Sequence, residues 1–248
     1  MVQRYVNGAG VPKQHANTRH SRYLCRMGKD KLKRFAENAA FPHVFQPRMQ
    51  FPMPDHLLKG KWLSDFFKND HPITLELGCG RAEYTVGLSG LFPERNFIGI
   101  DWKGARIWRG AKTTFEKGQT NAAFLRIMIG TIEAFFSTAD RVEEIWITFP
   151  DPQPRESREH KRLTSPEFLN HYRAFASSGC TVNLKTDSKP LYDYTLEVIR
   201  HQGLPVEVMT DDLYASPYVN DVLSIKTTYE KVWLAQGSKI CYLRFRLA

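Results

Sequence analysis

The sequence predicts an α/β fold, a doubly wound and mainly parallel sheet of seven strands with helices on both faces. Two observations support this prediction. From residue 71 onward, short apolar or β-branched runs alternate with helical stretches, as in βαβ units. The first of these runs ends in a Gly-x-Gly turn, Gly78 to Gly80, directly before a helical stretch. In open sheets of this kind ligands bind beyond the carboxyl ends of the strands, so we expect the functional site at that edge.

Each element follows from its local pattern. The runs expected as strands are Ile73–Leu77, Asn96–Ile100, Ala123–Ile127, Glu144–Phe149, Cys180–Lys185, Val206–Thr210 and Ile240–Arg246. The stretches expected as helices are Tyr84–Leu91, Lys103–Lys117, Thr131–Phe136, Pro166–Ala176, Pro190–Gln202 and Thr228–Ala235. A long excursion precedes the last strand, which favours its antiparallel insertion.

Residues 1–70, before the predicted sheet, lack the alternation of strands and helices. Residues 28–39 favour a short basic helix, and the Pro- and Phe-punctuated residues 40–60 favour an extended wrap. Residues 1–26 lack an apolar period, and we expect them to be disordered. The expected division is therefore a basic extension (1–26), an amino-terminal helix and wrap (27–70), and one large domain (71–248).

Composition excludes several classes of protein. The 248 residues are 42% hydrophobic and 12% aromatic, enough for a core. No apolar run of roughly 18 residues and no apolar signal segment occurs, so we expect a cytoplasmic protein without a membrane partner. Its four cysteines form no CxxC pair and have no nearby His cluster, which argues against a metal site or disulfides. They are Cys25, Cys79, Cys180 and Cys241.

Most of the net charge lies at the amino terminus. The chain carries +9, and residues 1–34 hold nine basic side chains against one acid, or +8 of that total. Three interpretations remain open: a solvated arm, an arm that neutralises nucleic-acid phosphates, or an upstream extension before a true start at Met27.

The glycine turn predicts a nucleotide-type site. Asp101 follows the second strand, 21 residues after Gly80, where an acid binds ribose hydroxyls in such folds. A dinucleotide fingerprint requires a third glycine at position 83, which is Glu83 here. With Glu76 just before the turn, the pocket suits a cationic cofactor such as S-adenosylmethionine better than a pyrophosphate. The alternative is an ordinary βα turn beside an exposed acid.

A second site signal follows the fourth strand. In Phe149-Pro150-Asp151-Pro152-Gln153-Pro154 the prolines restrict the backbone around one acid. Four cations follow closely, and they suit phosphate groups. They are Arg155, Arg158, Lys161 and Arg162. We therefore expect a rigid carboxylate facing a polyanion.

Six segments together resemble the tRNA (guanine-N7)-methyltransferase family over roughly residues 70–248. In chain order they are ELGCGRAEYT, NFIGID, WITFPDPQP, HKRLTSPEFL, LKTDS and TTYEKVW. The resemblance implies the Rossmann-like fold of class I methyltransferases, S-adenosylmethionine as cofactor, and tRNA as substrate. The implied product is 7-methylguanosine at position 46, in the variable loop. We expect a monomer or homodimer without an obligate partner subunit.

The resemblance also implies roles for individual residues. Cofactor positions fall on Glu76, Gly78, Gly80, Asp101, Thr131 and Asp151. Substrate positions fall on Arg155, Asp187, Thr227, Thr228, Tyr229 and Glu230. Asp151 lies where the family's catalytic acid is placed. We interpret it as orienting the guanine edge, the methionine end of the cofactor, or both.

This chain departs from the family pattern at several positions. Thr131 stands where an acid or Asn is common, and Gln153 replaces a common Trp. Arg155 replaces a lysine, and Glu156 and Glu159 interrupt the basic block. Two alternatives to an RNA methyltransferase remain open. A noncatalytic RNA-binding protein of the same fold is favoured by Thr131, whereas the basic block disfavours a small-molecule methyltransferase.

Overall fold

The computed structural model describes residues 31–247, and within them eight strands form one sheet in the order β1-β4-β3-β2-β5-β6-β8-β7. The predictions for residues 1–26, including their disorder, lie outside the described residues. The strands are β1 (Val44–Phe45), β2 (Ile73–Leu77), β3 (Asn96–Ile100), β4 (Ala122–Leu125), β5 (Val142–Thr148), β6 (Ala176–Thr186), β7 (Val206–Thr210) and β8 (Cys241–Arg246). All neighbouring pairs from β1 to β6 are parallel, which confirms the predicted fold class.

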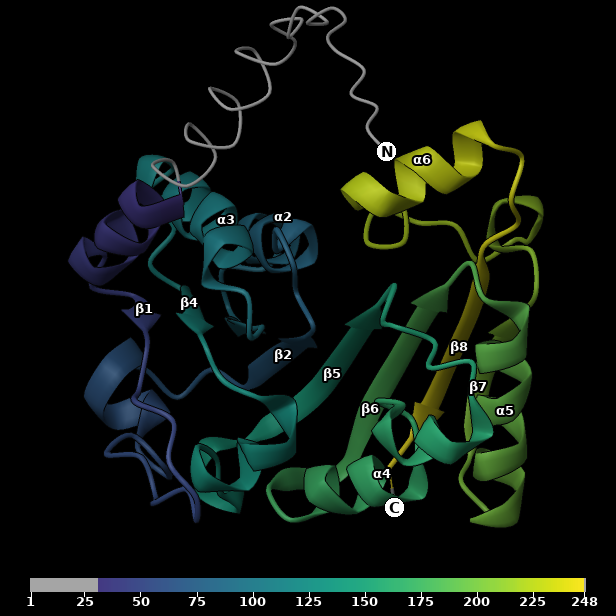
Figure 1. Ribbon diagram of the computed structural model, residues 1–248, viewed down its shortest axis with the longest axis horizontal. Helices are drawn as coiled ribbons and strands as arrows, with labels where there is room; N and C mark the ends of the chain where they lie inside the picture. The colour runs from purple at the N-terminus through teal and green to yellow at the C-terminus, as the bar shows by residue number, and fades with distance from the viewer. Residues whose placement is uncertain (1–30, 248) are drawn as a thin grey trace, which may run out of the picture.

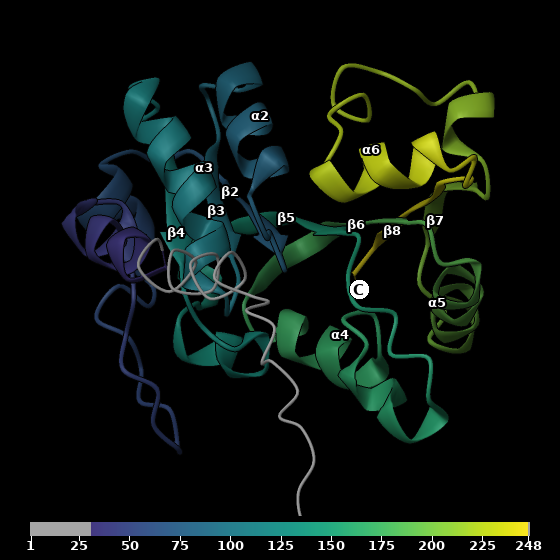
Figure 2. The same ribbon diagram turned by 45° about the horizontal axis from the view of Figure 1, so that its top comes forward.

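The helices lie around this sheet as a doubly wound fold requires. They are α2 (Glu83–Leu91), α3 (Gly104–Glu116), α4 (Pro166–Arg173), α5 (Lys189–His201) and α6 (Thr228–Ala235), and residues 31–40 are also helical. Helices α2 and α3 lie on one side of the sheet and α4 on the other (Figure 2). Helix α6 sits beyond the edge at which β5 and β6 end (Figure 1).

Local sequence explains where these helices begin. Ser165 and Ser188 each accept a hydrogen bond from a backbone N–H of the first turn, and Pro166 and Pro190 follow them. Thr227 forms a capping box at the start of α6. The predicted helices at 166, 190 and 228 therefore begin within one residue of the observed starts.

The last strand is antiparallel, as the long segment that precedes it suggested. Strand β8 runs between β6 and β7 and is antiparallel to both. The connection from β7 to β8 contains a 3₁₀ turn (Leu213–Ala215) and α6. This insertion brings α6 to the carboxyl edge of the parallel strands.

Several features differ from the sequence prediction. The wrap contributes an eighth strand, β1, which pairs with β4 and is too short to show a period of two. The helix expected at Thr131–Phe136 is a 3₁₀ helix over Ile129–Ala134. A π-helix (Trp62–Phe67) and 3₁₀ helices at Thr138–Asp140 and Glu156–Lys161 complete the elements.

The core lies on both faces of the central strands. Every residue of β2 and β3 is buried, as expected for strands covered on two sides. Trp62 anchors the amino-terminal region to this core, because its buried indole N–H donates to the carbonyl of Phe135 at 2.9 Å. A rigid sheet thus supports the residues at its carboxyl edge.

Candidate active site

The glycine turn connects β2 to α2 at the carboxyl edge of the sheet, where it contacts the residue after β3. Gly78 and Gly80 have φ values of 70° and 56°, a conformation in which a Cβ is strained. The N–H of Gly80 donates to one carboxylate oxygen of Asp101 at 2.9 Å, and the N–H of Lys103 donates to the other at 2.7 Å. The predicted acid therefore lies directly against the turn.

Glu76 lies buried beneath this turn with 2% of its surface exposed. One carboxylate oxygen accepts from the Thr85 N–H at 2.8 Å and from its hydroxyl at 2.6 Å. The other oxygen accepts from the Thr148 hydroxyl at 3.2 Å. Burial raises the pKa of Glu76 to about 7, with the nearby Glu83 adding to the rise and these hydrogen bonds opposing it. A cationic ligand nearby would favour the ionised form.

Asp151 lies exposed on a strained loop after β5. Phe149 and Gln153 have φ values of 50° and 45°, which are rare for residues with a side chain. The Gln153 N–H donates to the Asp151 carboxylate at 3.1 Å. Strained backbone of this kind persists where surrounding structure enforces it, often at functional sites.

Arg162 is the residue that holds the strained loop around Asp151 in place. Its guanidinium donates to the carbonyl of Pro152 at 3.3 Å and to that of Gln153 at 3.2 Å. It also lies over the ring of Tyr194, with Cζ 4.1 Å from the centroid. Arg162, expected from sequence to contact phosphate, thus braces the loop that carries Asp151.

Three more predicted residues flank the same edge. Thr131 follows β4, and its hydroxyl donates to the carbonyl of Met128 at 2.8 Å. Asp187 follows β6 and is half-buried, directly before the N-cap of α5. Arg155 is exposed after Asp151 at the start of a 3₁₀ helix.

Helix α6 is hydrogen-bonded to Glu83, the first residue of α2 and three residues after Gly80. The backbone N–H and the hydroxyl of Thr228 donate to one Glu83 oxygen, at 3.0 and 2.6 Å. The Thr227 hydroxyl and the Glu230 carboxylate complete the capping box. Tyr229 points outward and is 46% exposed. The residue that replaces the third glycine therefore holds α6 in place.

Glu230 faces into the protein. Its carboxylate lies 2.7 Å from the Lys185 ammonium, and both side chains are fully buried. The Tyr214 hydroxyl donates to the same carboxylate at 2.6 Å. Of the four α6 residues predicted to contact substrate, Glu230 alone has no exposed surface.

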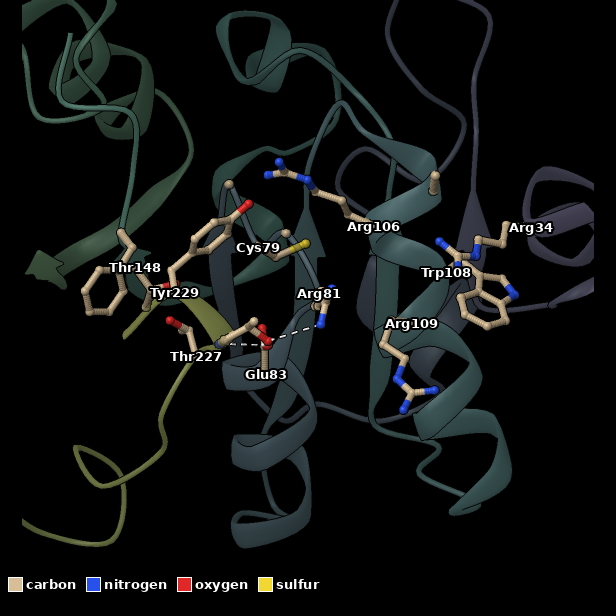
Figure 3. Close-up of a pocket in the computed structure, with 15 residues that line it drawn as sticks. Arg34, Cys79, Arg81, Glu83, Arg106, Trp108, Arg109, Thr148, Thr227 and Tyr229 are labelled. Carbon is tan, nitrogen blue, oxygen red and sulfur yellow. Dashed lines mark hydrogen bonds between the residues drawn. The ribbon is translucent and has the colours of Figure 1, made fainter. Parts of the chain in front are cut away.

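These elements enclose a cavity of about 510 Å³ (Figure 3). Five of the predicted site residues line it: Gly78, Gly80, Thr227, Thr228 and Tyr229. The others lie outside this lining: Glu76, Asp101, Thr131, Asp151, Arg155, Asp187 and Glu230. Among its cationic lining residues, Arg34 was predicted only as part of the basic segment 1–34, and no site role was predicted for Arg81, Arg106 or Arg109. These arginines come from two helices and from the residue after the glycine turn, so no local sequence pattern groups them.

Residues 31–247 lack two features that would point to other functions. No helix in this range has the length and apolar character needed to cross a membrane. No group of three or more His, Cys, Asp or Glu side chains in this range is arranged to hold a metal ion.

The fold resembles solved RNA methyltransferases. The 16S rRNA methyltransferase KamB superposes with a TM-score of 0.59 at 13% identity, over 83% of this chain and 99% of that chain. The 16S rRNA (adenine(1408)-N(1))-methyltransferase from Catenulisporales acidiphilia gives 0.55 at 14% identity, over 79% and 97%. At these identities the likeness concerns the fold.

Sequence comparison identifies the family. The family model Methyltransf_4, described as a methyltransferase, matches residues 70–243. The tRNA (guanine-N(7)-)-methyltransferase of Bacteroides fragilis is 50% identical over 222 residues, covering 89% of this chain and 87% of that protein. The enzyme of the same name from Cytophaga hutchinsonii is 48% identical over 221 residues, covering 88% and 98%. This chain therefore belongs to the tRNA (guanine-N(7)-)-methyltransferase family.

Proposed function

We propose that this protein transfers a methyl group from S-adenosylmethionine to N7 of a guanine in tRNA, at position 46 of the variable loop. The observation that carries the proposal is the joining of Asp101 to the glycine turn at the carboxyl edge of a methyltransferase fold. The names of relatives about 50% identical to this chain give the substrate. The protein acts as a monomer or homodimer. A reducing cytoplasm suits the three cysteines within residues 31–247, Cys79, Cys180 and Cys241, which are all free and buried.

The residues at this edge fit S-adenosylmethionine. Its sulfonium and ammonium are positive and its ribose carries two hydroxyls, so carboxylates suit it. Asp101 lies at the ribose position of nucleotide-binding folds, and the Glu76 carboxylate lies beneath the turn. Gly78 and Gly80 have no side chain that would block the cofactor. A Cβ at Gly80 would project into open space, with only one atom within 4 Å, so glycine leaves this space free for a ligand. Thr131 and Asp151 complete the proposed cofactor site.

The chemistry requires orientation more than proton transfer. The bound cofactor supplies a methyl group activated by a positive sulfur. Guanine N7 already presents a lone pair at its major-groove edge, so no base must remove a proton before transfer. The protein's contribution is alignment of the two reactants. Asp151, on its braced loop, orients the guanine edge, the methionine end of the cofactor, or both.

Substrate contacts surround this centre. Arg155 lies exposed after Asp151 and is placed to meet RNA phosphate. Asp187 flanks the same edge, and Thr227, Thr228 and Tyr229 line the cavity beside it. Glu230 contributes by fixing the start of α6 from within.

A direct assay tests the function. Purified protein is incubated with bulk tRNA and labelled S-adenosylmethionine, and nucleosides are read by mass spectrometry. We expect 7-methylguanosine, and we expect Asp151→Ala to lose nearly all transfer while keeping its thermal midpoint. Asp70→Ala removes an equally exposed carboxylate before β2 and should retain activity. Absence of 7-methylguanosine with folded, cofactor-binding protein would disprove the proposal.

A further inference from the structure

The cavity beside the glycine turn carries more positive charge than its role as a cofactor neighbour requires. Four arginines line it, against a single carboxylate, Glu83. They are Arg34 from the helical residues 31–40, Arg81 after the glycine turn, and Arg106 and Arg109 from α3. Segments far apart in the chain thus converge on one cationic cavity.

These arginines have no acidic partners within the protein. Among residues 31–247, no carboxylate lies within 4.0 Å of any of the four, whereas Arg244 and Arg246 both pair with Glu207. The one lining carboxylate, Glu83, already accepts two hydrogen bonds from Thr228. The cavity therefore has uncompensated charge available to an anion.

Aromatic rings accompany the charges. The Arg106 guanidinium lies over the Tyr229 ring, 5.6 Å from the centroid. On the other side of α3, Arg34 lies over Trp108 at 4.8 Å, and the two are neighbours in Figure 3. Tyr229 is 46% exposed. Guanidinium groups bind phosphates through paired N–H donors, and exposed aromatic rings stack on unpaired bases.

The acids of the proposed cofactor site, Glu76 and Asp101, do not line this cavity. Glu76 is buried beneath the turn and Asp101 is hydrogen-bonded to it. The cofactor carries two positive groups and is attracted to these acids. A cavity of about 510 Å³ lined by four arginines instead fits a larger anion.

We infer that this cavity binds a single-stranded segment of the RNA backbone next to the target guanine, with phosphates on Arg106 and Arg109 and a base against Tyr229. The inference rests on the proposed function and adds a substrate subsite to it. This subsite is separate from the basic segment that follows Asp151.

Binding measurements on paired variants test the subsite. Arg106→Gln with Arg109→Gln is titrated with fluorescent tRNA over a series of salt concentrations, and S-adenosylmethionine affinity is measured by calorimetry. We expect tRNA affinity to fall by about tenfold or more and the salt slope to decrease by about 2, one for each lost phosphate contact. Cofactor affinity should stay within about twofold.

Two controls separate charge from folding. Arg200→Gln removes an exposed arginine at the far end of α5 and should leave tRNA affinity unchanged. Arg106→Lys with Arg109→Lys keeps the charge and should restore most of the salt slope. All variants are compared by thermal midpoint.

The outcomes are distinguishable from those of the activity assay. Wild-type protein that forms 7-methylguanosine, with variants that bind tRNA as tightly as wild type, would overturn the subsite and leave the function standing. Variants that lose cofactor affinity but keep tRNA affinity would reassign the arginines to the cofactor carboxylate. Wild-type protein that binds no tRNA would overturn both.

Discussion

Lys185 and Glu230 form an ion pair of 2.7 Å in which neither side chain has any exposed surface. Lys185 also donates to the carbonyl of Leu223 at 2.9 Å and to that of Ile225 at 3.3 Å. Glu230 also accepts from the Tyr214 hydroxyl. One lysine of β6 thus binds both the loop before α6 and α6 itself, so the cavity wall formed by Thr227, Thr228 and Tyr229 depends on a fully buried pair.

We expect removal of either partner to destabilise the protein strongly. A buried charge without its partner costs roughly 3–5 kcal/mol, so Lys185→Met and Glu230→Gln should each lower the free energy of unfolding on that scale. The double variant Lys185→Met with Glu230→Gln leaves no charge buried and should recover much of the loss. Chemical denaturation of all four proteins measures the coupling. Additive losses would contradict a coupled pair.

The central strands were predictable because each is a continuous buried run. Ile73–Leu77 and Asn96–Ile100 were predicted with the observed bounds, and each is buried throughout. Strand β6 was predicted to begin at Cys180 but begins at Ala176, since its first four residues are small or polar and are not fully buried. Apolar patterning identifies strands where burial is complete and fails where it is partial.

The site was predictable where it depends on local chemistry. The glycine turn and Asp101 have a fixed spacing within one βα unit, and the structure joins them by a hydrogen bond. Lys185 and Glu230 are 45 residues apart, and only the antiparallel insertion of β8 brings α6 to β6. No local pattern indicates that pairing, so Glu230 was expected to face the substrate.

The hydrogen bonds between Thr228 and Glu83 predict a second effect. Thr228→Val removes the hydroxyl that donates to Glu83 at 2.6 Å, a charge-assisted bond of roughly 1.5–3 kcal/mol. With α6 less firmly held to Glu83, we expect kcat/KM for tRNA to fall by about tenfold. Thr228→Ser retains the hydroxyl and should restore most of it. Steady-state kinetics on wild type, Thr228→Val and Thr228→Ser measure this effect. A Thr228→Val variant with the kcat/KM of wild type would refute a role for the Thr228–Glu83 hydrogen bond in tRNA methylation.

The raised pKa of Glu76 predicts a pH-dependent stability. Below pH 4.5 the carboxyl is protonated in both states. Between the ordinary value of 4.5 and the folded value of about 7, only the unfolded chain releases its proton, so folding loses stability as pH rises. The loss reaches roughly 3 kcal/mol above pH 7. Glu76→Gln cannot titrate, so its stability relative to wild type should increase from pH 5 to pH 8 by up to that amount.

Denaturation of Glu76→Gln and wild type at both pH values measures this difference. Glu94→Gln, at an exposed position after α2, is the matched control for removing one carboxylate. Equal pH dependence in Glu76→Gln and wild type would show that Glu76 titrates normally. Glu76→Gln should also bind S-adenosylmethionine more weakly, since it removes a negative charge from beneath the glycine turn.

A substitution at Arg162 distinguishes two possible roles of this residue: supporting the loop that carries Asp151, or contacting an RNA phosphate. Its guanidinium donates to two loop carbonyls and lies over Tyr194, a geometry that the single ammonium of lysine cannot reproduce. Arg162→Lys keeps the charge, so a phosphate contact would survive the change while a brace would not. We expect kcat to fall on the order of tenfold with tRNA affinity and its salt slope nearly unchanged. The exposed Arg158 in the same segment should behave oppositely, with Arg158→Lys close to wild type in both kcat and tRNA affinity. If Arg162→Lys also kept full activity, the positive φ values at Phe149 and Gln153 would not depend on this arginine, and the orientation of Asp151 would need another source.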